Sequence, residues 1–219
     1  MRWKSIKTME KKYSIKEIFY TLQGEGFHSG RPAVFCRFAG CNFWNGKETD
    51  RKKAICTFCD TDFIGTDGQN GGQYTAAELA DKILSLWPAD QPNRFVVCTG
   101  GEPLLQLDQN MIEALHDSNF EIAVESNGSV EAPEGIDWLT ISPKSMDHFI
   151  QNSGDELKLV YPQDVLTPSV FGDLNFKHFY LQPMDGDHTA LNTKLSVDYC
   201  LKHPKWKLSL QTHKILGID

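Results

Sequence analysis

The chain has 219 residues, of which 40% are apolar, which is enough for one domain with a sizeable core. It carries 29 acidic and 22 basic side chains, and the net charge of −7 argues against a broad electrostatic grip on nucleic acid. It shows neither a run of ~20 apolar residues nor the apolar core of a signal peptide, so we expect a cytoplasmic protein that acts on a small molecule, without a membrane or nucleic-acid partner.

The chain opens with a polar, basic segment over residues 1–12, which predicts a flexible tail before a single domain over 13–219. Ser14 to Tyr20 is typical of a first strand. The loop Leu22-Gln23-Gly24-Glu25-Gly26 follows it, and its two glycines permit backbone shapes that are closed to other residues. Taken alone, such a loop is either an ordinary turn or a weak ligand-binding signal.

A second strand is predicted over Ala33 to Phe38. Alternation along this strand gives Cys36 the same parity as Val34 and Phe38, so its thiol is expected to point into the apolar core. Arg37 is then expected to face the opposite side, where a surface ion pair is the simplest role for it.

Three cysteines dominate the segment that follows. Cys41, Cys56 and Cys59 are separated by fourteen and two residues, and cysteines in a reducing compartment favour metal ligation or packing over disulfides. Three thiolates can hold three corners of a cubane iron–sulfur cluster and leave its fourth iron open, whereas a structural zinc site uses all four positions. A zinc site that adds Cys36 also suits the spacing, but the core position expected of Cys36 leaves three ligands.

Asp60 and Thr61 directly follow the last of these cysteines. Hard oxygen atoms beside soft sulfur ligands suggest a second, hard cation such as Mg²⁺, which completes its shell with substrate and water. A capping or turn role is the alternative. The insert between Cys41 and Cys56, residues 42–55, is polar and charged and is expected to cover or border the cluster.

Strands and helices alternate along much of the remaining chain. Residues 65–72 predict a flexible glycine-rich loop, and Thr75 with Glu78 predicts a capping box that opens a helix ending near Trp87. Further strands are predicted over Phe95 to Cys98, Glu121 to Glu125, Trp138 to Ile141, Glu156 to Tyr161, His178 to Leu181 and Lys207 to Leu210. Further helices are predicted over Gln109 to Asn119 with Asp108 as the cap, around Val165 to Leu174, and over Leu195 to His203 as the last one. The apolar tail from Gln211 to Asp219 is expected to be packed.

Four polar motifs each follow a predicted strand. They are Gly100-Gly101-Glu102, Ser126-Asn127-Gly128, Ser142-Pro143-Lys144 and Gln182-Pro183-Met184-Asp185. Right-handed crossovers put the carboxyl ends of parallel strands on one side of a sheet, so the motifs are expected to converge on one mouth. Singly, each is also explained as a turn or as surface. Because the elements are too few for a closed eightfold barrel, we predict an α/β fold, a partial parallel barrel in a single domain.

The three-cysteine loop, the TLQGEG loop and the GGE, SPK and QPMD motifs together resemble the radical S-adenosylmethionine (SAM) enzymes. Within that superfamily the chain is similar to the 7-carboxy-7-deazaguanine synthases, from about Tyr13 to its C-terminus. Most radical SAM enzymes have three residues between the first two cluster cysteines. This chain has fourteen, as in one branch of the synthase family.

The resemblance implies a [4Fe–4S] cluster on Cys41, Cys56 and Cys59, and Mg²⁺ on Thr61 with Asp60 in support. It implies SAM contacts from Gly101, Glu102, Ser126, Asn127, Ser142, Pro143, Lys144, Gln182, Pro183, Met184 and Asp185. It implies substrate contacts from Leu22, Gln23, Gly24, Glu25, Arg37, Thr99 and the main-chain carboxylate of Asp219. A planar guanidinium such as that of Arg37 suits a carboxylate bidentately.

The implied activity is that of a carbon–nitrogen lyase on the route to queuosine. SAM is cleaved to methionine and a 5′-deoxyadenosyl radical, which takes a hydrogen from 6-carboxy-5,6,7,8-tetrahydropterin, and ring contraction with loss of ammonia gives 7-carboxy-7-deazaguanine. We expect no side chain to be an obligatory acid or base, because the cofactors supply the hard step. A homodimer and an electron donor such as flavodoxin are also implied. The alternatives are another radical SAM enzyme, such as a glycyl-radical activase, and a non-catalytic zinc-binding module.

Overall fold

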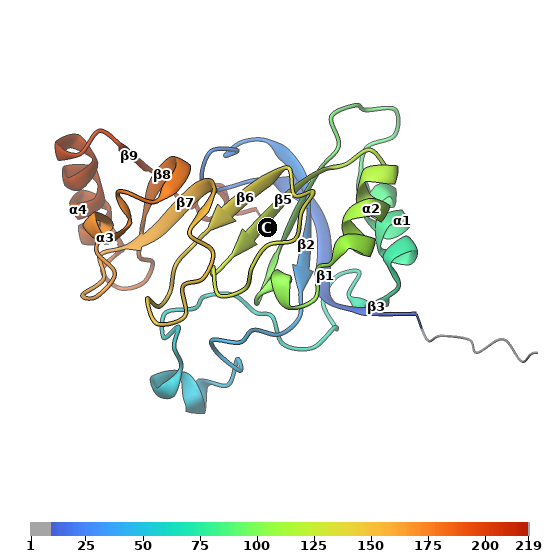
Figure 1. Cartoon of the computed structure of the whole chain (residues 1–219), viewed down its shortest axis with the longest axis horizontal. Coiled ribbons are helices and arrows are strands. Elements are labelled where there is room, and N and C mark those ends of the chain that lie inside the picture. The colour runs from blue at the N-terminus through green and yellow to red at the C-terminus, as the bar shows by residue number, and fades with distance from the viewer. Residues whose placement is uncertain (1–9, 219) are drawn as a thin grey trace, which may run out of the picture.

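The protein is described by a computed structural model over residues 10–218, and within these residues nine strands form one open sheet (Figure 1). The strands are β1 (Tyr13–Leu22), β2 (Pro32–Phe38), β3 (Gly72–Tyr74), β4 (Phe95–Gly100), β5 (Glu121–Ser126), β6 (Trp138–Ile141), β7 (Ser153–Tyr161), β8 (Asn175–Pro183) and β9 (Trp206–Leu208). Their order across the sheet is β3-β1-β2-β4-β5-β6-β7-β8-β9. From β2 to β9 neighbouring strands are parallel, while β1 is antiparallel to both β2 and β3. The predicted α/β class and partial barrel are confirmed.

Most of the predicted tail over 1–12 lies outside the described residues, as does Asp219. Close to the start of the described chain, Lys11 Nζ donates hydrogen bonds to Gln106 O at 2.7 Å and to Asp108 Oδ2 at 2.6 Å. Residue 11 is therefore tied to the segment that opens the second helix. No helix within residues 10–218 is long and apolar enough to cross a membrane.

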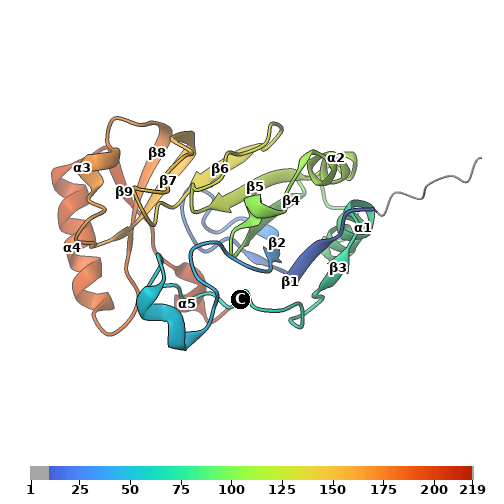
Figure 2. The same cartoon turned by 60° about the horizontal axis from the view of Figure 1, so that its bottom comes forward.

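Helices cover the outer face of the sheet chiefly at its two ends (Figures 1 and 2). α1 (Ala76–Leu86) and α2 (Gln109–Asp117) pack on each other at one end, and α4 (Thr189–Lys202) packs on β8 and β9 at the other. The shorter helices are α3 (Pro168–Phe171), α5 (Thr212–Leu216) and the 3-10 turns η1 (Glu48–Lys53) and η2 (Pro103–Leu105). Loops over 127–137 and 142–152 replace helices between β5 and β6 and between β6 and β7. Helices are thus reduced in number, as predicted, and the alternation of strands and helices is less regular than expected.

Alternate residues of each strand face either the helices or the barrel interior. On β2, Val34, Cys36 and Phe38 are fully buried in the cluster that also holds Leu79 of α1 and Met111 of α2. The predicted core position of Cys36 is therefore confirmed. The opposite parity faces inward, where a second buried cluster fills the floor of the barrel, formed by Ala33, Phe95, Val97 and Ala123.

The predicted helix caps are present. Glu78 N donates to Thr75 Oγ1 at 3.3 Å and Thr75 N donates to Glu78 Oε2 at 2.8 Å, which completes the capping box of α1. Met111 N donates to Asp108 Oδ1 at 3.3 Å at the start of α2. The helix predicted around Val165 to Leu174 is only the single turn α3, and α4 begins before the predicted Leu195.

Two predicted segments differ from the structure. The glycine-rich stretch over 65–72 is hydrogen-bonded along β1, where Ile18 N donates to Gln69 O at 2.8 Å and Asn70 Nδ2 donates to Ile18 O at 2.8 Å. The tail forms a further helix, α5, and its apolar residues are not packed, since Ile215 is 72% exposed and Leu216 is 62% exposed. The reason is that α5 turns its polar side chains toward the interior, as described below.

Substituting Ile83 of α1 by Ala should lower the free energy of unfolding by roughly 2–5 kcal/mol, because Ile83 is fully buried and the change leaves a cavity in the main cluster. Urea unfolding followed by tryptophan fluorescence measures the loss. The control is Asp81→Ala on the exposed face of the same helix, which should change stability by less than about 0.5 kcal/mol. Equal effects of the two variants would contradict this packing.

Candidate active site

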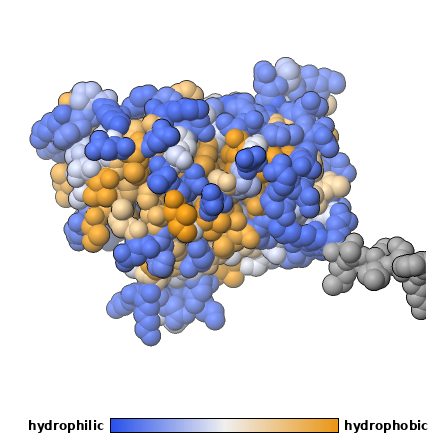
Figure 3. All heavy atoms as spheres, in the orientation of Figure 1, coloured by the Kyte–Doolittle hydropathy of each residue, from blue (hydrophilic) through white to orange (hydrophobic). Residues whose placement is uncertain are grey.

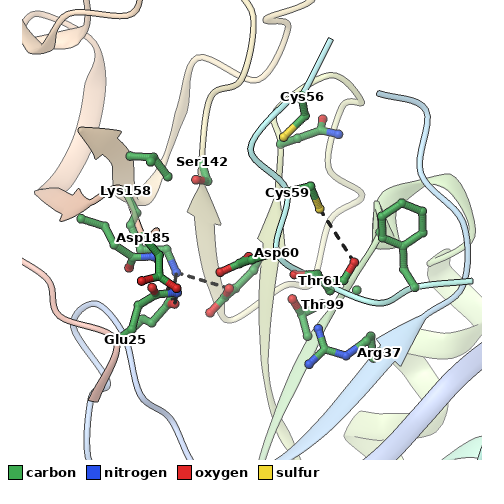
Figure 4. A pocket seen from close by; sticks show the side chains of 18 of the residues that line it. Glu25, Arg37, Cys56, Cys59, Asp60, Thr61, Thr99, Ser142, Lys158 and Asp185 are labelled. Carbon is green, nitrogen blue, oxygen red and sulfur yellow. Dashed lines mark hydrogen bonds and ion pairs between the residues drawn. The ribbon is translucent and has the colours of Figure 1, made fainter. Parts of the chain in front are cut away.

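One large cavity, of about 510 Å³, opens where the carboxyl ends of the parallel strands meet (Figure 4). Most of the residues predicted to bind ligands line it: Leu22, Gln23, Gly24, Glu25, Arg37, Cys41, Cys56, Cys59, Asp60, Thr61, Thr99, Gly101, Ser126, Asn127, Ser142, Lys144, Gln182, Pro183, Met184 and Asp185. These residues come from segments spread along the chain from β1 to β8. The strand-end motifs therefore meet at one mouth, as predicted.

Among residues 10–218, two predicted residues do not line this cavity, because Glu102 and Pro143 are buried. Asp219 lies outside the described residues. Glu102 Oε1 accepts a hydrogen bond from Leu104 N at 3.0 Å, and its Oε2 accepts one from Asn127 N at 2.7 Å. This carboxyl group therefore joins the end of β4 to the end of β5, and its predicted contact with SAM would use the remaining lone pairs of the same two oxygens.

Three thiols, those of Cys41, Cys56 and Cys59, lie on the cavity wall, and Figure 4 shows the Cys59 thiol directed toward Thr61. A hydrogen bond from Cys56 lowers the pKa of the Cys59 thiol to about 6, so its thiolate form is accessible near neutral pH. Phe43 N donates to Cys41 Sγ at 3.4 Å. Within residues 10–218, no three His, Cys, Asp or Glu residues are placed to share a single metal ion.

The four-cysteine zinc site is not formed. Cys36 is fully buried on the helix side of β2, whereas Cys41, Cys56 and Cys59 lie at the cavity. Burial raises the pKa of the Cys36 thiol well above its ordinary value, and nearby Cys98 raises it further. Cys36 is thus a core residue that lies apart from the three cysteines of the cavity.

A lysine of α5 crosses the cavity mouth. Lys214 Nζ donates to Asp60 Oδ2 at 2.7 Å and to Asp185 Oδ2 at 2.6 Å, so α5 joins the cysteine loop to the end of β8. The Asp60 carboxylate is therefore already paired. The Thr61 hydroxyl, in contrast, makes no hydrogen bond to any described residue, which leaves it available to a hard cation.

Close contacts explain both glycines of the TLQGEG loop. A Cβ atom on Gly24 would lie 2.2 Å from His213 Nδ1 of α5. One on Gly26, whose φ is +64°, would lie 2.1 Å from Glu156 Oε1 of β7. The loop is clamped between these two elements, and Glu25 between the glycines is directed into the cavity.

A buried ammonium organises the inner part of the cavity. Lys158 of β7, whose side chain is 4% exposed, donates from Nζ to Glu25 Oε2 at 2.5 Å and to Glu125 Oε2 at 3.3 Å. Glu25 Oε1 accepts from the side-chain amides of Gln182 at 3.1 Å and Gln211 at 2.9 Å. Burial alone would raise the pKa of Glu25, but the charge of Lys158 outweighs it and lowers that pKa to about 2. Glu25 is therefore an anion at neutral pH.

Arg37 faces the barrel interior, as its strand parity predicts. Its Nε donates to Glu17 Oε1 at 2.7 Å. The two terminal nitrogens of its guanidinium make no hydrogen bond within residues 10–218, so the fork remains open to a planar anion.

Sequence reasoning missed several polar residues of the cavity wall, namely Glu17, Glu125, Lys158, Gln211, His213 and Lys214. A period-two signal was present for some of them. Along β7, Leu157 and Leu159 join the helix-side core, while Lys158 between them has the opposite parity. A charged residue at the inward parity of a barrel strand is a recognisable sign of a polar interior.

Known proteins resemble this chain over nearly its whole length. The chain is 59% identical over 207 residues to the 7-carboxy-7-deazaguanine synthase of Bradyrhizobium diazoefficiens, and this alignment covers 94% of the chain and 99% of the relative. The chain belongs to the 7-carboxy-7-deazaguanine synthase family. Another member of the family, from Caulobacter vibrioides, is 58% identical over 207 residues, with the same shares of both chains covered. No family model matches the chain.

The fold has a counterpart among solved structures. The crystal structure of QueE from Escherichia coli matches with a TM-score of 0.65 at 24% identity, over 91% of this chain and 93% of that one. At this identity the likeness concerns the fold alone, and it supports the open α/β sheet described above. Family membership itself rests on the more similar 7-carboxy-7-deazaguanine synthases.

Substituting Lys158 by Met should lower the free energy of unfolding by roughly 3–5 kcal/mol at neutral pH, because it leaves Glu25 and Glu125 without their buried counter-charge. The matched control is Lys177→Met. Lys177 is 72% exposed and pairs with Asp155, so its loss should cost less than about 1 kcal/mol. Urea unfolding of both variants at pH 7 gives the two values, and a small loss for Lys158→Met would exclude a structural dependence on this charge.

Glu156 predicts a pH effect of defined sign. Its side chain is buried, Phe27 N donates to Oε2 at 3.0 Å, and burial raises the pKa of this carboxyl. A raised folded pKa favours folding at low pH, and this contribution is lost as the pH rises from the unfolded value of about 4.3 through the folded pKa. Glu156→Gln keeps an acceptor but cannot ionise. Relative to the unmodified chain, its unfolding free energy should rise between pH 4 and pH 8, and a flat or falling difference in urea titrations would refute the assignment.

Proposed function

We propose that the chain is a SAM- and Mg²⁺-dependent carbon–nitrogen lyase that converts 6-carboxy-5,6,7,8-tetrahydropterin to 7-carboxy-7-deazaguanine, with loss of ammonia, in queuosine biosynthesis. Membership of the 7-carboxy-7-deazaguanine synthase family supports this activity. The observation that carries it is that three cluster-type thiols and a polar interior open onto one cavity of about 510 Å³, a volume typical of a small-molecule site.

The cofactor part of the proposed site lies near the cysteine loop. Cys41, Cys56 and Cys59 would hold the [4Fe–4S] cluster, and the strand-end residues would hold SAM: Gly101, Glu102, Ser126, Asn127, Ser142, Pro143, Lys144, Gln182, Pro183, Met184 and Asp185. When bound, the cluster and SAM supply radical chemistry that side chains cannot perform. The share of the protein is to orient the cofactor and substrate and to exclude water.

The substrate part of the proposed site is the interior between β1, β2 and β7. The Glu25 anion, oriented by Lys158 and two amides, would accept N–H groups of the pterin ring. The open fork of Arg37 would pair with the pterin carboxylate. Leu22, Gln23, Gly24, Thr99 and the main-chain carboxylate of Asp219 complete the proposed contacts.

A hard-ion site is proposed at Thr61, whose hydroxyl lines the cavity without a partner among the described residues. Mg²⁺ bound there would help to orient the substrate carboxylate. Asp60 would support the site through its charge, since its carboxylate is already paired with Lys214. We further propose that the enzyme is a cytoplasmic homodimer that receives its electron from a donor such as flavodoxin.

The activity is tested by anaerobic reconstitution with iron and sulfide. The reconstituted protein is then incubated with dithionite, SAM, Mg²⁺ and 6-carboxytetrahydropterin, and the products are identified by mass spectrometry. The proposal predicts 5′-deoxyadenosine together with 7-carboxy-7-deazaguanine. Cleavage of SAM without conversion of the pterin would favour another radical SAM activity, such as that of a glycyl-radical activase, and would show that the substrate contacts are wrong.

Two cysteine variants test the ligand set in the same preparation. Cys59→Ala should lose most of the bound iron and all conversion, because it removes a proposed ligand from the cavity wall. Cys36→Ala should keep the iron content of the unmodified protein, because Cys36 lies in the core on the far side of β2. Iron loss in Cys36→Ala, or iron retention in Cys59→Ala, would exclude the proposed ligand set.

A further inference from the structure

The insert over residues 42–55 has no role in the substrate or SAM contacts described above. Figure 1 shows its short helix, η1, projecting from the body below the sheet, and Figure 3 shows that this projecting end is hydrophilic. No residue of η1 is buried. A projecting, charged segment of this kind could receive a partner, or it could support the loop that it interrupts.

Arg51 of η1 makes contacts on several sides of its guanidinium group, although it belongs to a projecting segment. The Arg51 guanidinium lies over the Trp44 ring, with Cζ 4.0 Å from the ring centroid. Its Nε and one terminal nitrogen donate to the two oxygens of Glu48 at 2.7 and 2.6 Å. The Trp44 ring covers one face of the guanidinium, and the Glu48 carboxylate binds one of its edges with both oxygens. Together these two contacts fix the orientation of the guanidinium.

The other terminal nitrogen of Arg51 reaches the cysteine loop. It donates to Thr57 O at 3.1 Å and to Cys59 O at 2.9 Å. Both carbonyls belong to the four-residue stretch that carries Cys56 and Cys59. The guanidinium therefore bridges the backbone between two proposed ligands to the insert that precedes them.

The base on which Arg51 rests is itself anchored. Trp44 is 7% exposed, and its ring packs edge-on against Phe63, with the centroids 5.6 Å apart. Its indole Nε1 donates to Lys47 O at 3.3 Å. Phe63 thus supports Trp44, and Trp44 supports Arg51. Arg51 in turn holds the backbone of the cysteine loop.

We infer that Arg51 is a positioning residue for the iron–sulfur cluster, and that the insert acts as a brace for the cysteine loop through Arg51 rather than as a docking platform. The inference rests on the proposed function, since it assumes that Cys41, Cys56 and Cys59 hold a cluster. Arg51 fixes the carbonyls of the loop and brings a permanent positive charge next to it. That charge favours the one-electron-reduced cluster, which carries one more negative charge than the oxidised one.

The insert itself provides a matched control. Lys52, the next residue, is exposed, and its side chain makes no hydrogen bond or ion pair to any described residue. Lys52→Met removes the same unit of charge from the same short helix without touching the loop. Arg51→Lys keeps the charge but loses the planar fork. Glu48→Gln weakens the contact that orients the guanidinium and also removes one negative charge beside it.

The test uses reconstituted full-length protein without SAM or pterin. Iron per chain is measured first, then the rate of iron loss to a chelator, then the midpoint potential by dithionite titration monitored by electron paramagnetic resonance. Arg51→Met should lose iron several-fold faster than the unmodified protein. At a fixed potential its ratio of reduced to oxidised cluster should be roughly tenfold lower, which corresponds to a fall in midpoint potential of about 59 mV for one electron. Arg51→Lys should recover most of the potential but still lose iron quickly. Glu48→Gln should lose iron at an intermediate rate without a fall in potential, because it removes a negative charge. Lys52→Met should match the unmodified protein in both measurements.

Each contrary outcome is distinct. If the unmodified protein takes up no cluster, the proposed function fails. If it takes up a cluster and Arg51→Met behaves in the same way, only the role of Arg51 fails. Equal shifts in Arg51→Met and Lys52→Met would show a general effect of charge. A defect that appears only when flavodoxin replaces dithionite as the reductant would instead identify the insert as a docking surface, and it would overturn the inference.

Discussion

The ion pair of Lys158 with Glu25 and Glu125 is the interaction on which the interior of the barrel depends. An ammonium that is 4% exposed can remain charged only beside carboxylates, and those carboxylates can remain inside only with donors on their oxygens. Glu25 in turn belongs to a loop that needs two glycines to pass between α5 and β7. The charge, the loop and the last helix therefore form one unit, whose polar groups are already oriented before a ligand arrives.

Local signals in the sequence account for much of the fold and for the position of the site. Period-two alternation placed Cys36 in the core and Arg37 on the opposite face of the sheet, and both placements are confirmed. The cap signals of α1 and α2 are also confirmed. The convergence of the strand-end motifs followed from the handedness of parallel connections, which does not depend on side-chain detail. These features could be predicted because each is fixed by neighbours in sequence or by a rule of chain topology.

The features that were missed depend on contacts between distant parts of the chain. Lys214 lies 154 positions from its partner Asp60, and nothing in the tail sequence indicates that pairing. The tail was expected to pack because it is apolar, yet the polar residues of α5 had partners in the cavity and its apolar residues were left outside. Arg51 lies in a segment without periodicity, so its contacts with the cysteine loop emerge only from the folded backbone.

The loops that take the place of helices around β6 have a consequence for how this protein can change. The segments 127–137 and 142–152 cover the outer face of the sheet, where Phe149 packs on Phe171, and their first residues reach the cavity as the SNG and SPK motifs. Gly128 O accepts hydrogen bonds from both Ile150 N and Gln151 N, which joins the two loops. The same short segments therefore both cover the outer face of the sheet and contact the cavity. If a helix covered this face, its sequence could change without altering the strand end that forms the site. Here a substitution that is selected for its effect on the outer surface also affects the cavity, because both depend on the same segment.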